Sequence, residues 1–240
     1  MKTLLLTGAS GAIGKSIAKV FLDNGYFVVG QYNLGETSVK ELKKEFPEKF
    51  FPFKADLKYA EETNKLLEYF YENFSHANVF IHCAGKDVYR LSQETSEEEW
   101  DDLFNINVKS AFILNKRVIP DMVNRKSGKI IFITSVWGKF GASMESAYSA
   151  SKAALSVYAK SLAKELGPSS VTVNCVCPGV INSPMNARFN KEEVEELILR
   201  TPLGRIGTPK EVANLCRFIA EDGADFITGQ EIVIDGGFTL

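Results

Sequence analysis

Short apolar runs alternate with longer stretches of helical period along the whole chain of 240 residues. A short run that is apolar throughout predicts a strand buried on both faces, and apolar residues recurring every three to four positions predict a helix. The predicted strands are Leu4–Leu6, Tyr26–Val29, Phe50–Phe53, Val79–Cys83, Ile130–Thr134, Val171–Cys177 and Ile232–Ile234. The predicted helices between them include Gly14–Asn24, Thr37–Phe46, Glu61–Phe74 and Ala147–Leu166. This alternation predicts an α/β fold in which about seven parallel strands form one doubly wound sheet with helices on both faces.

Residues that favour turns and helix ends lie where this pattern places the ends of helices. Gly25 follows the first helix at the position suited to a left-handed C-terminal cap. Thr95-Ser96 precedes Glu97–Glu99, and this stretch offers an N-cap followed by first-turn acids. Leu166-Gly-Pro168 is expected to stop the long helix. No linker, low-complexity tract or internal repeat interrupts the alternation, so residues 1–240 are predicted to form a single domain.

The composition and charge are those of an ordinary soluble globular protein. Of the residues, 45% are hydrophobic and 24% are charged, and the net charge of −2 provides no basic field for nucleic acid. Since no run of about 18 apolar residues is present, no transmembrane helix is predicted. The apolar run Leu4–Leu6 is much shorter than the hydrophobic region of a secretory signal, so the expected compartment is the cytoplasm.

The four cysteines, Cys83, Cys175, Cys177 and Cys216, lack the spacing of metal-ligand pairs. Cys175 and Cys177 alternate within an apolar strand, and the two histidines of the chain cannot complete a zinc site around them. We therefore expect buried thiols and no metal site.

The stretch TGASGAIGKS fits two different nucleotide-binding patterns. Read as [AG]-x-x-x-x-G-K-[ST], it resembles a P-loop in which Lys15 would address a triphosphate. A P-loop also needs an acid that holds Mg²⁺ after a second apolar strand, whereas the candidate strands end in His82, Ser135 and Cys177. Read from Thr7, the stretch forms a strand, a glycine turn and a helix start, which can bind a dinucleotide pyrophosphate through backbone N–H groups. The context favours the dinucleotide.

Further motifs connect this turn to a known family. Thr7–Gly14 resembles the T-G-x-x-x-G-x-G turn of the short-chain dehydrogenase/reductase family, although the second glycine falls on Ala12 and Gly11 stands one place early. Tyr148–Lys152 matches the family's Y-x-x-x-K, and Ser135 lies thirteen residues upstream, as it does in that family. The other matches are Asp56-Leu57, His82–Gly85, Asn107, Pro178-Gly179, Pro202–Gly207 and Ile227–Gly237. The resemblance covers nearly the whole chain and implies a Rossmann-type NAD(P)-dependent oxidoreductase.

The resemblance implies a catalytic set of Asn107, Ser135, Tyr148 and Lys152. Tyr148 and Lys152 are four residues apart and so share one helix face, where the ammonium favours the phenolate needed for acid–base catalysis. The hydroxyl of Ser135 would hold the substrate oxygen beside Tyr148. Asn107 would position a water against the lysine, and its spacing from Trp100 favours it over the nearby Asn105.

The same resemblance implies which residues contact the cofactor. Asp56 would accept a hydrogen bond from the adenine amino group, and Ser183 stands where a threonine is usual. His82 and Cys83 depart from the usual Asn-Asn. The implied contacts are Gly8, Ser10, Gly11, Ala12, Ile13, Gly14, Tyr32, Asn33, Asp56, Leu57, Cys83, Ala84, Gly85, Tyr148, Lys152, Pro178, Gly179, Ile181 and Ser183.

The choice of cofactor depends on the end of the second strand. An acid there would bind the ribose 2′-hydroxyl of NAD and repel a 2′-phosphate, but the strand ends in Gly30–Asn33 without one. The arginine that often binds the phosphate is also missing, with Gly11 and Leu34 at its usual places. Lys15 offers weak support for a phosphate, so NADP(H) is preferred and NAD(H) remains an alternative.

The pattern is most similar to bacterial 3-oxoacyl-[acyl-carrier-protein] reductases, which implies an acyl-thioester substrate. The segment Lys86–Thr95 and the pair Ser169-Ser170 differ from those reductases, so a sugar, polyol or other small ketone is the alternative substrate. A dinucleotide-binding redox sensor is a more distant alternative, because such proteins usually lose the tyrosine or the lysine. Substrate choice is expected to depend on the loop Ile181–Asn190 and the helix Lys191–Arg200.

The family commonly forms homotetramers, and this chain offers suitable surfaces. The segments Phe104–Val118 and Ala153–Leu166 carry more apolar and small residues than one core-facing stripe needs, which predicts a second buried face. The small residues are Ala111, Ala153, Ala154, Ala159 and Ala163. Ile232–Ile234 would form an apolar edge strand that a neighbouring subunit covers, with Phe238–Leu240 near that neighbour.

Overall fold

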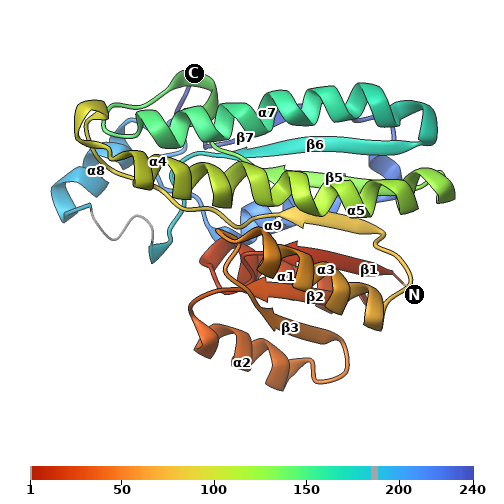
Figure 1. The fold of residues 1–240 in the computed structure, drawn as a ribbon. Coiled ribbons are helices and arrows are strands. Elements are labelled where there is room, and N and C mark those ends of the chain that lie inside the picture. Colours follow the sequence, from red (N-terminus) through yellow and green to blue (C-terminus); the bar gives the residue numbers. More distant parts are fainter. Residues whose placement is uncertain (1, 185–188) are drawn as a thin grey trace.

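Seven parallel strands form one sheet in the computed structural model, which describes residues 2–184 and 189–240 (Figure 1). Their order across the sheet is β3-β2-β1-β4-β5-β6-β7. The strands are β1 (Thr3–Thr7), β2 (Phe27–Tyr32), β3 (Phe50–Lys54), β4 (Val79–His82), β5 (Gly128–Ile133), β6 (Val171–Pro178) and β7 (Glu231–Ile234). Each one overlaps a strand predicted from the apolar runs, so the α/β, doubly wound prediction is confirmed.

Helices cover both faces of this sheet. They are α1 (Ala12–Asp23), α2 (Glu36–Glu45), α3 (Ala60–Asn73), α4 (Glu97–Phe104), α5 (Ser110–Arg125), α6 (Trp137–Phe140), α7 (Ser146–Leu166), α8 (Lys191–Leu199) and α9 (Pro209–Ile219). The core beneath α1, α2 and α9 lies on one face, and the core beneath α3, α5 and α7 lies on the other. A five-residue π-helical segment, Asn105–Lys109, joins α4 to α5.

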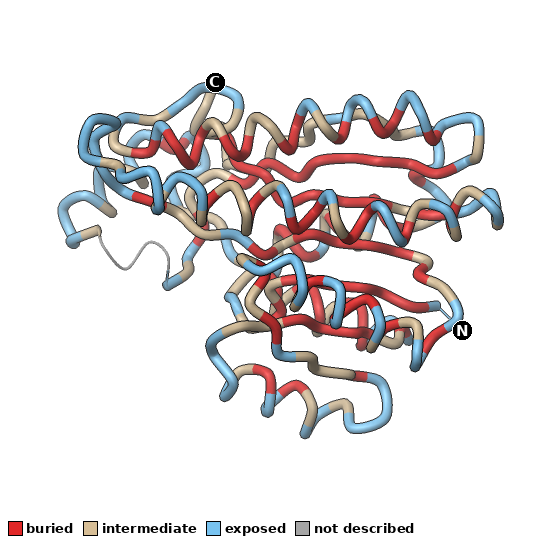
Figure 2. Tube along the Cα trace, in the orientation of Figure 1, coloured by how far each residue is buried: buried red, intermediate tan, exposed pale blue. Residues whose placement is uncertain are grey.

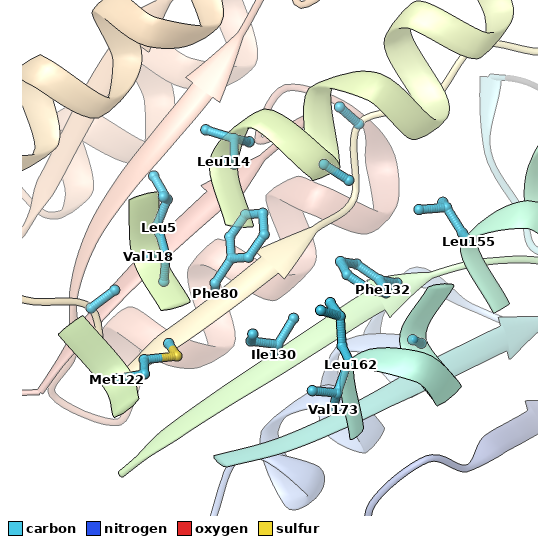
Figure 3. Close-up of a cluster of buried hydrophobic side chains, with 14 of the residues drawn as sticks. Leu5, Phe80, Leu114, Val118, Met122, Ile130, Phe132, Leu155, Leu162 and Val173 are labelled. Atoms are coloured by element: carbon cyan, nitrogen blue, oxygen red, sulfur yellow. The ribbon is translucent and has the colours of Figure 1, made fainter. Parts of the chain in front are cut away.

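Strand alternation divides the core between the two faces. On β4, Phe80 packs toward α5 while Ile81 packs toward α1, as expected when successive side chains point to opposite sides. Figure 3 shows Phe80 and Phe132 from the sheet beside Leu114 and Leu155 from the helices. Burying each such side chain stabilises the fold by roughly 1.5–3 kcal/mol. The packing of the helices on both faces therefore holds the strands, and with them the strand ends, in place.

The outer strands are less buried than the pattern predicts. β1, β4 and β6 are fully buried, whereas most of β3 and all of β7 are only partly covered (Figure 2). The prediction of burial on both faces is therefore wrong for these two strands, because both stand at an edge of the sheet.

All three expected helix ends lie where the sequence places them. Gly25 is left-handed, with φ of 83°, and Ser96 forms a capping box with Glu99. The long helix α7 ends at Leu166, and the chain then passes through a short 3₁₀ turn before Ser170 becomes left-handed with φ of 56°. Within the described residues, no helix is long and apolar enough to cross a membrane.

The strand order creates a crevice at one edge of the sheet. The chain winds outward from β1 toward β3, and then outward again from β4 toward β7. Because successive connections leave β1 and β4 in opposite directions, a crevice opens beyond the carboxyl ends of these two strands. That is the edge where the predicted site residues should meet.

Candidate active site

A cavity of about 770 Å³ lies at the carboxyl ends of the strands. It brings together nearly all of the residues predicted from the sequence, although they come from segments far apart in the chain. Those lining it are Gly8, Ser10, Gly11, Ala12, Ile13, Gly14, Asn33, Asp56, Leu57, Cys83, Ala84, Gly85, Ser135, Tyr148, Lys152, Pro178, Gly179, Ile181 and Ser183. Two predicted residues, Tyr32 and Asn107, are not part of this lining.

The glycine turn after β1 packs tightly against the turn after β4. Gly8 has φ of 72°, and a Cβ atom there would lie 2.8 Å from the Ala84 Cα and N atoms. The Thr7 hydroxyl accepts hydrogen bonds from the backbone N–H groups of Cys83, at 3.1 Å, and Ala84, at 3.0 Å. A Cβ atom at Gly14 would lie 2.0 Å from the Gly8 carbonyl oxygen, so the start of α1 sits directly on the turn.

Gln31 holds this turn against the ends of β2 and β3, a role that the sequence did not reveal. Its side-chain oxygen accepts from the Gly8 N–H at 2.9 Å, and its amide donates to the Ala55 carbonyl at 2.7 Å. Gln31 also lines the cavity. Tyr32, the neighbour predicted from the sequence, instead packs against the core beneath α1, because successive residues of β2 face opposite sides.

The predicted catalytic side chains approach the cavity from β5 and α7. Lys152 Nζ donates a 2.9 Å hydrogen bond to the Ile133 carbonyl and lies 5.6 Å from the centre of the Tyr148 ring. Ser135 follows β5, and its hydroxyl accepts from the Trp137 N–H at 3.2 Å. That bond leaves the Ser135 hydroxyl hydrogen able to reach a substrate oxygen. The geometry unites a hydroxyl, a phenol and an ammonium group in one cavity.

Asn107 lies behind Gly85, outside the cavity lining, and is fully buried. Its side-chain oxygen accepts from the Lys86 N–H at 2.8 Å, and its amide donates to the Lys86 carbonyl at 3.0 Å and to Ser151 Oγ at 2.9 Å. A Cβ atom at Gly85 would lie 3.5 Å from the Asn107 oxygen and 3.2 Å from Lys152 Nζ. Asn107 therefore ties the loop after β4 to α7, next to the lysine.

Several residues at the catalytic end of the cavity were not identified from the sequence. They are Lys86, Asp87, Trp137 and Glu145. Glu145 is only 5% exposed and stands three residues before Tyr148. Three of them lie in loops and Trp137 begins the four-residue helix α6, so none has a periodic signal that would have marked it. Residues 185–188 of the loop Ile181–Asn190, which was expected to set substrate choice, lie outside the described residues.

The structure gives no support to the P-loop interpretation of the opening turn. Lys15 forms an ion pair with Glu41 at 2.5 Å and does not line the cavity. For the same reason, Lys15 adds nothing in favour of a cofactor phosphate. Cys175, Cys177 and Cys216 are buried free thiols, and Cys83 is half-buried in the cavity wall. No cluster of three or more potential metal ligands occurs among the described residues.

Burial makes the charge of Lys152 costly to the fold. Desolvation lowers the pKa of Lys152 from 10.5 to about 8. The unfolded chain therefore binds the proton more tightly between these two values, so stability rises with pH across this window. The free energy of unfolding of the cofactor-free protein can be measured in urea at pH 7 and at pH 10.5. Between these values it should rise by roughly 3 kcal/mol more in wild type than in Lys152→Met. A difference that stays constant with pH would contradict the buried ammonium.

The cavity suits an extended dinucleotide. Three glycines, Gly8, Gly14 and Gly85, stand where any side chain would meet neighbouring atoms, so the backbone can approach a ligand closely. The N–H groups at the start of α1 can bind a pyrophosphate. Asp56 lines the β3 end, and its side chain already accepts from the Lys58 N–H at 3.0 Å. Ile181 and Ser183 line the cavity after β6, which stands next to β5 in the sheet and far from β3.

Comparison with known proteins gives full-length similarities. A family model described as enoyl-(acyl carrier protein) reductase matches residues 8–239. The 3-oxoacyl-[acyl-carrier-protein] reductase FabG of Thermotoga maritima is 33% identical, covering 100% of this chain and 98% of its own. An uncharacterised oxidoreductase of Bacillus subtilis, YmfI, is 33% identical over 99% and 98% of the two chains. A solved structure from Brucella melitensis, described as a short-chain dehydrogenase/reductase of the glucose/ribitol dehydrogenase type, matches with a TM-score of 0.91 and 30% identity over 100% and 97%.

Proposed function

The chain belongs to the short-chain dehydrogenase/reductase family, and from this we propose that it is an NADP(H)-preferring reductase of 3-oxoacyl thioesters. The observation that carries the reaction class is the meeting of Ser135, Tyr148 and Lys152 in a cavity that also has the glycine turn. The thioester substrate is supported by the similarity to 3-oxoacyl-[acyl-carrier-protein] reductases. We place the reaction in the cytoplasm, since four free thiols suit a reducing compartment.

Tyr148 is the acid and base of the proposed reaction. The bound nicotinamide cofactor would supply the hydride in reduction and accept it in oxidation. Ser135 holds the substrate oxygen by donating its hydroxyl hydrogen, and the Tyr148 phenol donates a proton to that oxygen as it gains negative charge. The Lys152 ammonium then stabilises the phenolate that remains. In the oxidative direction the phenolate takes the proton back from the alcohol.

A small hydroxylated ketone, such as a sugar or an oxidised polyol, is the second candidate substrate. Glu145 favours it, because a buried carboxylate at the catalytic end of the cavity can accept hydrogen bonds from substrate hydroxyl groups. Consumption of NADPH with acetoacetyl thioesters, simple ketones and ketoses decides between the two. The proposal requires turnover of the thioester at least tenfold faster, by kcat/KM, than of any ketose. The reverse order would establish the second candidate.

Cofactor preference can be tested at the turn after β1. The neutral residues Gln31, Asn33 and Leu34 line this end of the cavity, and they would not repel a 2′-phosphate. Gly11 has φ of −71°, and a Cβ atom there would meet only the Gly8 oxygen, at 3.5 Å. Gly11→Arg should therefore fit and raise the preference for NADPH over NADH about tenfold by adding a phosphate partner. Gly11→Gln is the uncharged control, and an equal change in both variants would contradict a phosphate contact.

We propose that the enzyme assembles as a homotetramer. Phe112 on α5 and Val157 on α7 are 52% and 62% exposed, which supports a second apolar face on these helices. The small residues support it less than expected, because Ala111, Ala159 and Ala163 already belong to the chain's own core. Phe238 packs against Trp137 and Arg200 of its own chain, so its contact with a neighbour is not needed to hold it.

Light scattering tests this assembly. Wild type should have about four times the chain mass of 26.6 kDa. Phe112→Glu should lower that mass at least twofold, because a charge would have to be buried in the interface. Tyr59→Glu is the matched control, since Tyr59 is 53% exposed and precedes α3 rather than lying on α5 or α7. A monomeric wild type would refute the assembly.

A further inference from the structure

His82 is a buried polar residue to which the proposed reaction gives no role. It ends β4 next to the cavity wall, is fully buried, and stands where the family usually has asparagine. The rings of Phe80 and Phe132 lie beside it, each with its centre 6.4 Å from the imidazole and 6.5 Å from the other. A buried imidazole needs hydrogen-bond partners for both nitrogens, because an unpaired buried polar atom is destabilising.

The Thr7 hydroxyl determines which nitrogen carries the proton. Thr7 Oγ1 lies 3.0 Å from His82 Nδ1 and already accepts hydrogen bonds from the N–H groups of Cys83 and Ala84. Its own hydrogen is therefore the one available for His82, so Nδ1 must accept. Burial, and after it the Lys152 ammonium, lowers the pKa of His82 to about 3, so the ring is neutral. A neutral ring whose Nδ1 accepts carries its proton on Nε2.

The backbone of Ile106 and Asn107, at the π-helical segment, lies near the His82 ring. No acceptor among the described residues meets full hydrogen-bond geometry with Nε2. The backbone carbonyls of Asn107 and Ile106 are nevertheless close enough to raise the pKa of His82 against the larger effect of burial. A π-helical segment within an α-helix shifts the carbonyl directions, and such segments are frequent at functional sites.

We propose that His82 is a positioning residue, whose neutral ring links Thr7 in the cofactor turn to the Ile106–Asn107 backbone beside Lys152. Accepting from Thr7 and donating toward the π-helical carbonyls, it connects β1, β4 and the α4–α5 junction through one side chain. Asn107 in turn binds Lys86 and Ser151, the residue before Lys152. The catalytic consequence rests on the proposed function, whereas the tautomer and the backbone contact do not.

The tautomer can be measured directly, because the chain has only two histidines. In long-range ¹H–¹⁵N spectra, His82 should appear as the neutral Nε2–H form throughout the neutral pH range. His76, which lies near the surface beside Ser75, can be assigned with His76→Gln. A His82 that carries its proton on Nδ1, or that becomes charged near neutral pH, would overturn the proposal.

Three variants test the positioning role. In His82→Phe both nitrogens are lost at similar volume, in His82→Asn an amide reaches only the place of Nδ1, and in His82→Gln an amide reaches the place of Nε2. We expect His82→Phe and His82→Asn to lower kcat at least tenfold with KM for NADPH within threefold, and His82→Gln to recover most of kcat. Backbone amide shifts should change across Asn105–Lys109 in the first two variants, whether or not a substrate has been found.

A purely structural role gives a different result. In that case kcat would follow thermal stability across the three variants, and the packing control Phe132→Leu, on the neighbouring strand, would lose kcat to the same degree. Either outcome would refute the positioning role. If wild type turned over no carbonyl substrate, the proposed function would fail, while the tautomer and the amide shifts would still decide the contact of His82 with the π-helical segment.

Discussion

Tyr148→Phe should lower kcat about 10²- to 10⁴-fold, the range that a positioned acid or base contributes. Only the phenol oxygen is removed, and the ring keeps its place on α7 beside Lys152. Because the ring is nine-tenths buried and its packing survives, thermal stability should change little. The affinity for NADPH, measured by fluorescence titration without substrate, should stay within about threefold of wild type, since the lost proton acts only in the transition state.

Tyr158→Phe is the matched control for this variant. Tyr158 lies on the same helix, ten residues further on, and packs against the core rather than the cavity. It should keep kcat within a small factor of wild type. Equal activity of Tyr148→Phe and wild type, or an equal loss in both variants, would remove Tyr148 from its role as acid and base.

The meeting of Ser135, Tyr148 and Lys152 is the part of the site that the sequence predicts best. Ser135 directly follows an apolar run, and parallel strands bring their carboxyl ends to one edge, so its position follows from the sheet. Tyr148 and Lys152 share a helix face because they are four residues apart. The glycine turn is predictable for a similar reason, since it connects a short apolar strand to a helix start.

The contacts that depend on strand alternation and long-range packing could not be predicted in this way. Gln31 and Tyr32 are neighbours on β2 and face opposite sides of the sheet, so Gln31 contacts the glycine turn and Tyr32 contacts the core. The sequence does not indicate which of the two adjacent residues faces the turn. Trp137 begins the short helix α6, Glu145 lies just before α7, and both reach the cavity only through the packing of α6 against α7. Likewise, alanine occurs in cores and interfaces alike, so Ala111 and Ala159 were not recognised as core residues.

Gly14→Ala should weaken NADPH binding roughly 10- to 100-fold, because the added methyl cannot fit beneath the glycine turn. A Cβ atom at this position would lie 2.0 Å from the Gly8 oxygen and 2.7 Å from the Gly8 carbonyl carbon, and both are backbone atoms with little freedom to move. Gly8 is itself held by Gln31 and packed against Ala84, so the turn cannot shift without disturbing β2 or β4.

The nearby Gly11→Ala provides the comparison, because the two substitutions add the same methyl to the same turn. Gly11 has ordinary backbone angles, and its Cβ would make only a 3.5 Å contact with the Gly8 oxygen. We therefore expect Gly11→Ala to bind NADPH within about threefold of wild type, while Gly14→Ala loses affinity and some thermal stability. The measurement is the dissociation constant of NADPH by fluorescence titration for both variants. An equal loss of affinity in both variants would indicate that each methyl clashes with NADPH itself. The explanation from the close packing of α1 on the Gly8 carbonyl would then be wrong.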